Sequence, residues 1–448
     1  MTFSSKTKEL EYFRSLEAVR ERSNWVYSLV KEGKSKYFKV DEAKLGKVAS
    51  FIRELIARDY ASAIAVPAHG RWRSFEIQSG SDTEQKRDLI DEHIQKWKSG
   101  GVDSKEICRR VIDLFVVSVI LDAGAGSKWE YFDSETNSTY KRTEGLGIAS
   151  LRMFEAGMFS SDQESPFQVD SKKLLSFSDK DLIKGFQVSE SNPLIGTENR
   201  AKLIRNLGRV ISNEEVFFPR SGGKSSSRPG NMFDYLVSKS IYGKIGVKQL
   251  WKVIIEGFYE VWPKTETKIE QVSLGDAWKC DILMQGTFSN RFEEYHNIIP
   301  FHKLSMWLTW SLVEAIERVG NLVVCDLHLL TGLPEYRNGG LLVDMGVIQL
   351  NQSIIDEQIM AGNVNAEDKT PLFEVNSQVV VEWRALTITL LDKLHLVMCD
   401  ALGLKTSEFP LNKLLEAGSW KAGRELSFKF RPKTGNPPVG IISDGTVF

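Results

Sequence analysis

Hydrophobic positions recur with helical spacing along most of the chain. Between residues 7 and 60, apolar side chains return every three or four positions, as at Leu10, Phe13, Leu16 and Val19, and this period predicts amphipathic helices. The same spacing predicts further helices from residue 145 onward and over residues 104–121, 179–187, 198–212, 231–239, 247–260, 302–319, 339–358 and 377–402. We therefore expect a mainly α protein.

A few short segments follow a different pattern. Residues 129–143 are rich in Thr, Ser and Tyr, which predicts a small hairpin within 127–143. From residue 418 onward, the runs 426–430 and 439–442 are β-prone, which predicts small β elements at the C-terminus.

One stretch, residues 220–230, is rich in Gly and Ser and predicts a flexible surface loop between two lobes. The expected N-terminal helical lobe, with the hairpin, covers residues 1–220. The expected C-terminal helical lobe, with the β-prone tail, covers residues 231–448. We expect these two lobes to share one core.

Composition and charge narrow the classes of function. The 448 residues are 42% hydrophobic and 26% charged, as in a globular protein, which excludes disorder as the main state. Lys plus Arg number 58 against 59 Asp plus Glu, so there is no basic field to hold a nucleic-acid partner. The charged start and the lack of an apolar run of membrane-spanning length predict a cytoplasmic protein without a membrane partner. The four cysteines are far apart and most histidines lie on separate segments, so we expect no metal and no other cofactor.

The turn at residues 331–340 contains the densest group of side chains that could act in catalysis or binding. It places Glu335, Tyr336 and Arg337 next to one another, framed by Pro and Gly and followed by an apolar helix. Helix N-termini favour anions, so this turn is a candidate functional loop. The same pattern also fits an exposed Glu-Arg pair beside a helix end.

Other charged residues stand in apolar or aromatic surroundings. Glu382 and Arg384 fall in an otherwise apolar helix, where a lone charge is costly, so each needs a partner; a structural buried ion pair is the favoured interpretation. His302 and Lys303 begin a helix and are candidates to face a cavity or solvent. Arg71 and Arg73 alternate with aromatic residues in a loop, where solvated surface cations are the default interpretation.

An alternative motif lies at residues 322–332. A strand-like run is followed by Asp326 and then by Thr331 and Gly332, a spacing that resembles the phosphoribosyl-diphosphate loop of phosphoribosyltransferases. Such a loop needs adjacent acids, whereas Leu327 stands in the second acidic position, and Pro334 stiffens the segment that follows. The motif thus matches in spacing but departs at these two positions, and phosphoribosyl transfer is kept as an alternative function.

Several longer motifs are distinctive, at residues 69–75, 121–126, 144–154, 331–340 and 443–448. Together they resemble the uracil catabolism protein four family, and the resemblance runs nearly end to end. This resemblance implies a link to uracil breakdown. It also implies the label of uracil phosphoribosyltransferase that such proteins often carry.

A more distant resemblance suggests a mechanism. Residues 334–337 and 382–384 resemble segments of the queuosine salvage proteins, which are helical N-glycosidases related in fold to helix-hairpin-helix DNA glycosylases. Lys303 matches a lysine of that family, and residues 153–160 loosely match its pocket segment. Ser311 stands where that family has an acid, and Asp162 is the candidate to replace it. The resemblance implies a helix-hairpin-helix DNA-glycosylase-like body.

These observations lead to the hypothesis of an N-ribosyl bond hydrolase. Its substrate would be a pyrimidine-derived nucleotide or the ring-opened ribosylurea product. Glu335 would stabilise the oxocarbenium-like transition state and orient or deprotonate the water, and Tyr336 or a backbone N–H would assist the leaving nitrogen. A phosphate would bind cationic donors. The candidate substrate-binding residues are Arg337, Lys303, His302, Phe154, Phe159, Asp162, Trp72, Arg71, Glu382 and Arg384. The alternatives are a phosphoribosyltransferase and a non-catalytic nucleotide-binding protein.

Overall fold

The protein was analysed as a computed structural model, which describes residues 5–79, 82–122, 124–126, 128–220, 226–262, 264–286 and 293–442. The chain forms two compact units. Unit 1 comprises Met1–His69, Lys264–Met306 and His328–Ser443, and unit 2 comprises Gly70–Pro263, Trp307–Leu327 and Asp444–Phe448. This division runs through both of the expected lobes, because each unit takes segments from residues 1–220 and from residues 231–448.

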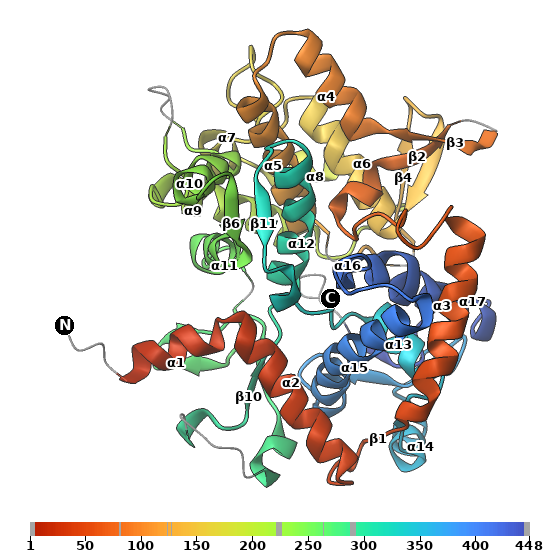
Figure 1. Ribbon diagram of the computed structural model, residues 1–448. Helices are drawn as coiled ribbons and strands as arrows, with labels where there is room; N and C mark the ends of the chain where they lie inside the picture. The colour runs from red at the N-terminus through yellow and green to blue at the C-terminus, as the bar shows by residue number, and fades with distance from the viewer. Residues whose placement is uncertain are drawn as a thin grey trace. The chain divides into compact units, whose positions relative to one another are not determined.

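Helices make up most of both units, and every sheet among the described residues has only two strands (Figure 1). The prediction of a mainly α protein with small β elements is confirmed. No helix in the described part of the chain combines the length and the apolar character needed to cross a membrane. Residues 221–225 of the Gly/Ser-rich stretch and the terminal motif 443–448 lie outside the described residues.

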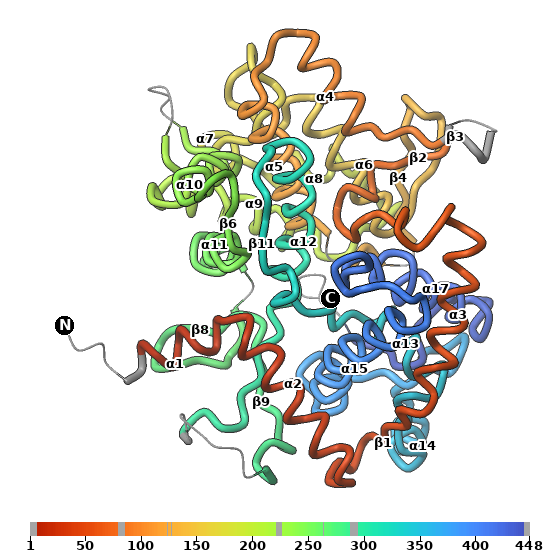
Figure 2. Tube along the Cα trace, viewed as in Figure 1, coloured from red at the N-terminus to blue at the C-terminus, as the bar shows by residue number. Residues whose placement is uncertain are grey.

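Unit 1 is built from three separate stretches of the chain, which Figure 2 traces in red, green and blue. Its helices are α1 (Ser5–Phe13), α2 (Leu16–Lys31), α3 (Leu45–Asp59), the start of α12 (Lys303–Arg318), α13 (Tyr336–Asp344), α14 (Gln352–Met360), α15 (Gln378–Leu402), α16 (Leu411–Leu414) and α17 (Lys421–Phe430). Its antiparallel strand pairs are β1 (Phe38–Val40) with β12 (Ile348–Leu350), β9 (Ala277–Lys279) with β10 (Ile298–Pro300), and β7 (Lys268–Ile269) with β8 (Val272–Ser273). A parallel pair joins β13 (Leu372–Glu374) and β14 (Gly440–Ile442).

Helix α15 forms the centre of unit 1. The Ser377 side chain caps its N-terminus by accepting a hydrogen bond from the Val380 N–H, and Gly403, at φ 65°, ends it in the left-handed conformation. Its first half is buried on all sides, and it packs against α2, α3 and α13. Helix α13 begins directly after Glu335, so this packing holds the turn at residues 331–340 on the rigid core of unit 1.

The predicted helix over residues 339–358 is wrong, because two helices and a strand occupy this stretch. Helix α13 stops at Asp344, and Gly346 adopts φ 74°, which turns the chain out of the helix. Residues Ile348–Leu350 then pair with β1, and α14 starts after Asn351.

The C-terminal segment differs from expectation in a similar way. Residues 426–430, predicted as a strand, belong to α17, whereas the run 439–442 does contain strand β14. Helix α17 buries Gly423 against α13, where an added Cβ would lie 2.1 Å from the Arg337 carbonyl oxygen. Tertiary packing therefore decides the conformation of this segment against its local β propensity.

Unit 2 contains the remaining helices and the predicted hairpin. Its helices are α4 (Leu89–Ser99), α5 (Ser104–Ile120), α6 (Arg142–Glu155), α7 (Ser171–Leu175), α8 (Asp179–Gly185), α9 (Thr197–Asn213), α10 (Met232–Lys239), α11 (Val247–Lys252) and most of α12. Its strand pairs are β2 (Glu76–Ser79) with β3 (Asp82–Asp88), β4 (Glu130–Asp133) with β5 (Ser138–Lys141), and β6 (Lys244–Gly246) with β11 (Val323–Cys325). The β4–β5 pair confirms the hairpin within residues 127–143.

Candidate functional site

Glu335 occupies the N-cap position of α13. One carboxylate oxygen, Oε2, accepts hydrogen bonds from the backbone N–H groups of Arg337 at 2.8 Å and Asn338 at 3.3 Å. The other oxygen, Oε1, accepts no hydrogen bond from any residue that the structure describes, and the side chain is partly exposed. The carboxylate is therefore fixed by backbone donors at one oxygen and has no described donor at the other.

The charge state of Glu335 depends on opposing influences. Burial raises the pKa of its carboxyl group above the ordinary value, while the positive charges of Arg337 and Lys303 and the two N–H donors act in the lowering direction.

The neighbours of Glu335 on α13 are firmly held. The Arg337 side chain is buried, donates from Nη1 to the Gly435 carbonyl oxygen at 2.9 Å, and lies 5.0 Å from the centre of the Tyr336 ring. The Asn338 amide donates to the Leu333 carbonyl oxygen at 3.0 Å. Glu335 and its flanking groups thus have a defined geometry.

Arg384 forms a bidentate ion pair with Asp276, a residue that the sequence analysis did not single out. The two nitrogen-oxygen distances are 2.8 and 2.7 Å, and the guanidinium lies 4.1 Å from the centre of the Phe301 ring. Burial would raise the pKa of Asp276, but the paired Arg384 holds it below its ordinary value. Asp276 is far from Arg384 in sequence and stands in no motif, so no sequence signal pointed to it.

Asp276 also orders the start of α12. Its backbone oxygen accepts from Phe301 and His302, and its Oδ2 atom accepts from the Lys303 backbone N–H at 2.9 Å. The buried His302 ring hydrogen-bonds through Nε2 to the Phe13 carbonyl oxygen, and burial lowers the pKa of that ring. The His302 ring is therefore held against the backbone of α1, and the charge of Lys303 acts on the Glu335 carboxyl group.

Glu382 does not pair with Arg384. Its carboxylate accepts a 2.5 Å hydrogen bond from the Ser35 hydroxyl, and its side chain is buried. Burial raises the pKa of Glu382 to about 7, although Ser35 and Lys36 act in the lowering direction. Each of the two charged residues has its own partner, and only Arg384 lies in a buried ion pair.

Arg71 and Trp72 belong to unit 2, where both are fully buried. The Arg71 guanidinium pairs with Asp122 at 2.7 Å and donates to the Ser118 hydroxyl, and the Trp72 indole donates to Asp88 at 2.8 Å. The default interpretation of Arg71 and Arg73 as solvated cations is wrong. Arg71 is buried, and the mostly buried Arg73 pairs with Glu76 and Glu314.

The other candidates from residues 153–162 also lie in unit 2. Phe154 and Phe159 are buried, and Phe159 stacks on Phe177 with the ring centres 5.7 Å apart. Asp162 is exposed and accepts a hydrogen bond from the Glu164 N–H in a local turn. Ser311, in the position of the missing acid, accepts from the Arg71 backbone N–H. In unit 2 the two phenylalanines are core residues.

The alternative phosphoribosyl-diphosphate segment also has a defined place. Strand β11 precedes Asp326 as expected, but it pairs only with β6. Asp326 adopts φ 63°, and a 3₁₀ turn follows at Leu327–Leu329. The extended parallel sheet that this loop requires is absent from the described residues. Among the described residues, no group of three or more His, Cys, Asp or Glu side chains is placed to hold a metal ion.

Comparison with known proteins identifies the family. Residues 12–448 match the family described as "Protein of unknown function (DUF1688)", and the chain belongs to this family. It is 38% identical over 450 residues to Uracil catabolism protein 4 of Lachancea kluyveri, covering 98% of this chain and 99% of that protein. It is 37% identical over 445 residues to Protein urg3 of Schizosaccharomyces pombe, covering 99% and 100%. The resemblance to the uracil catabolism protein four family is confirmed.

Proposed function

We propose that this chain takes part in uracil catabolism by hydrolysing an N-ribosyl bond. The substrate is a pyrimidine-derived nucleotide or the ribosylurea that remains after the pyrimidine ring is opened. The pathway rests on the relatives, one of which carries the name Uracil catabolism protein 4. The proposal of a hydrolytic reaction is based on the environment of the Glu335 carboxylate.

The observation that carries the proposal is the two-sided environment of the Glu335 carboxylate. Two backbone N–H groups fix Oε2, while Oε1 has no hydrogen-bond donor among the described residues. Lys303 and Arg337 supply positive charge, and burial raises the carboxyl pKa. Cleavage of a ribosyl C–N bond develops positive charge on the sugar, and a preorganised carboxylate stabilises that charge.

The proposed chemistry uses one water molecule. Glu335 accepts a proton from the water through Oε1 while the water oxygen bonds to the anomeric carbon. The C–N bond breaks, its electron pair leaves with the nitrogen, and Tyr336 assists by donating a hydrogen bond or proton. Lys303 is the candidate donor to a 5′-phosphate.

The test is a turnover assay with the full chain on uridine monophosphate, ribosylurea and ribosylurea 5′-phosphate. Glu335→Gln keeps an oxygen that can cap α13 but cannot take a proton. We expect it to lower kcat by about 100-fold or more on the accepted substrate.

Asp103→Asn is the matched control, because Asp103 caps α5 in unit 2 through two backbone N–H groups in the same way. It is expected to leave kcat unchanged. Equal turnover by wild type and Glu335→Gln would contradict the role of Glu335. Product formation only with added diphosphate would favour the phosphoribosyltransferase, and tight binding without product would favour the non-catalytic binding protein.

A further inference from the structure

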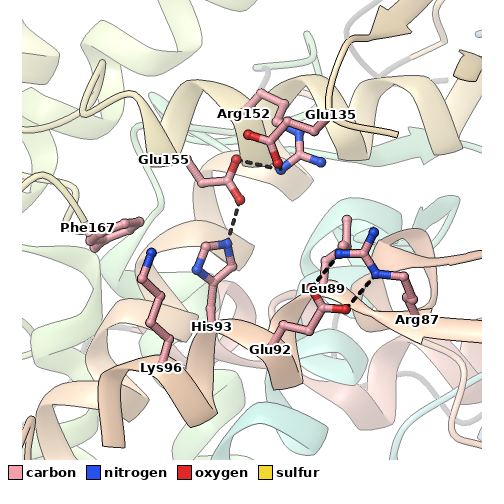
Figure 3. A pocket seen from close by; sticks show the side chains of 9 residues that line it. All are labelled: Arg87, Leu89, Glu92, His93, Lys96, Glu135, Arg152, Glu155 and Phe167. Atoms are coloured by element: carbon pink, nitrogen blue, oxygen red, sulfur yellow. Dashed lines mark hydrogen bonds and ion pairs between the residues drawn. The ribbon is translucent and has the colours of Figure 1, made fainter. Parts of the chain in front are cut away.

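A pocket of about 290 Å³ lies within unit 2, and none of the candidate site residues named above is among the residues that line it (Figure 3). Its floor is one face of α4, where Leu89, Glu92, His93 and Lys96 follow one another at helical spacing. The volume lies just below the usual range of about 300–1,000 Å³ for small-molecule sites, so an occupant has to be small.

Fixed side chains form the wall opposite α4. Arg152, on α6, forms a bidentate pair with the buried Asp133 at 2.9 Å for both contacts and also binds Glu155 at 2.7 Å and Glu135 at 2.8 Å. The second oxygen of Glu155 contacts Nε2 of His93 (Figure 3). These contacts hold the wall in place before any ligand enters.

The wall around Arg152 carries more negative than positive charge. Glu135 and Glu155 line the pocket and share this single guanidinium with Asp133, which is buried outside the lining. Glu155 also contacts His93, whereas Glu135 is largely exposed, with a side-chain exposure of 65%. A group with a positive charge and several N–H donors would balance these carboxylates.

Lys96, in contrast, contributes a positive charge that no described carboxylate balances by a direct contact. Arg87, a further cation of the lining, is paired with Glu92 through two contacts of 2.8 and 2.7 Å, whereas the side-chain ammonium of Lys96 makes no ion pair or hydrogen bond with any described residue. Figure 3 shows Lys96 beside Phe167 on one side of His93, with Arg152 and Glu135 on the other side. The lining thus offers a free cation at one side and surplus carboxylates at the other.

We propose that this pocket binds a short zwitterion, a molecule that joins an ammonium group to a carboxylate through a few methylene groups. The ammonium faces Glu135 and Glu155, the carboxylate faces Lys96, and the methylenes lie beside His93 between them. A bare anion would meet the surplus carboxylates, and a bare cation would meet Lys96, so each fits only half of the pocket.

Calorimetric titration of the full chain with glycine, β-alanine and 4-aminobutyrate tests this inference, with propionate and propylamine as singly charged probes. We expect at least one of the three amino acids to bind about tenfold or more tightly than both singly charged probes. Lys96→Met and Glu135→Gln, both at exposed side chains, should each weaken that binding. Lys98→Met is the matched control, since Lys98 is an exposed residue of α4 outside the pocket lining.

Three results would overturn the inference: no binding of any amino acid at about 10 mM, equal binding of a singly charged probe, or unchanged binding in Lys96→Met. None of these results bears on Glu335, because the pocket and the proposed catalytic carboxylate belong to different units.

Discussion

The buried carboxyl group of Glu382 should make the free energy of unfolding fall as the pH rises, and Glu382→Gln should remove this fall. Glu382 is buried on α15, its only described hydrogen-bond donor is the Ser35 hydroxyl, and burial raises the pKa of its carboxyl group from 4.5 to about 7. Between these two values the unfolded chain releases the proton while the folded chain keeps it. The unfolded state then binds fewer protons, so the free energy of unfolding falls as the pH rises through this window.

The magnitude follows from the pKa difference. One pKa unit corresponds to about 1.4 kcal/mol, so the Glu382 contribution to the free energy of unfolding falls by about 2 to 3 kcal/mol between pH 5 and pH 8. Glutamine at this position accepts the Ser35 hydrogen bond and does not titrate. The stability of Glu382→Gln relative to wild type should therefore rise by that amount over the same pH interval.

Urea unfolding of both proteins at pH 5 and pH 8, followed by the helical signal, measures this difference, because the other titrating groups cancel between them. Glu374→Gln, at an exposed carboxylate of β13, is the control and should show no such trend. A change of less than about 1 kcal/mol between the two pH values for Glu382→Gln would refute the reasoning.

Two further predictions concern packing in unit 1. Asp276→Asn leaves the buried Arg384 without its carboxylate, and urea unfolding should show a loss of about 3–5 kcal/mol; a loss below about 1 kcal/mol would contradict a tightly coupled pair. Gly423→Ala places a Cβ 2.1 Å from the Arg337 carbonyl oxygen, so thermal unfolding should show a loss of about 1–3 kcal/mol. Gly46→Ala, in a helix with open space around the added Cβ, should be neutral or stabilising, and an equal loss in both variants would rule out the close contact as the cause.

The helices that the sequence predicted best carry their own start and stop signals. Residues 377–402 were predicted as a helix and α15 covers Gln378–Leu402, because Ser377 caps one end and Gly403 terminates the other. The segments predicted wrongly depend on distant partners. Strand β12 forms against β1, which lies far earlier in the chain, and α17 is held by its packing on α13.

The candidate site shows the same division between local and distant information. The turn with Glu335 was recognisable because its residues are adjacent, and the structure places them at the start of α13 as the pattern indicated. The partner of Arg384 was not predictable, because Asp276 approaches it only through the fold. Arg71 was misread as a surface cation because its partner, Asp122, lies on another segment.

The most direct test of the proposed hydrolysis is whether water alone is sufficient as the second substrate. Wild-type protein acting on ribosylurea 5′-phosphate in buffer without phosphate or diphosphate should release urea and the free sugar 5-phosphate in equal amounts, at a rate that Glu335→Gln lowers by about 100-fold or more. Release that requires added phosphate or diphosphate, or that is unchanged in Glu335→Gln, would contradict hydrolysis at this site.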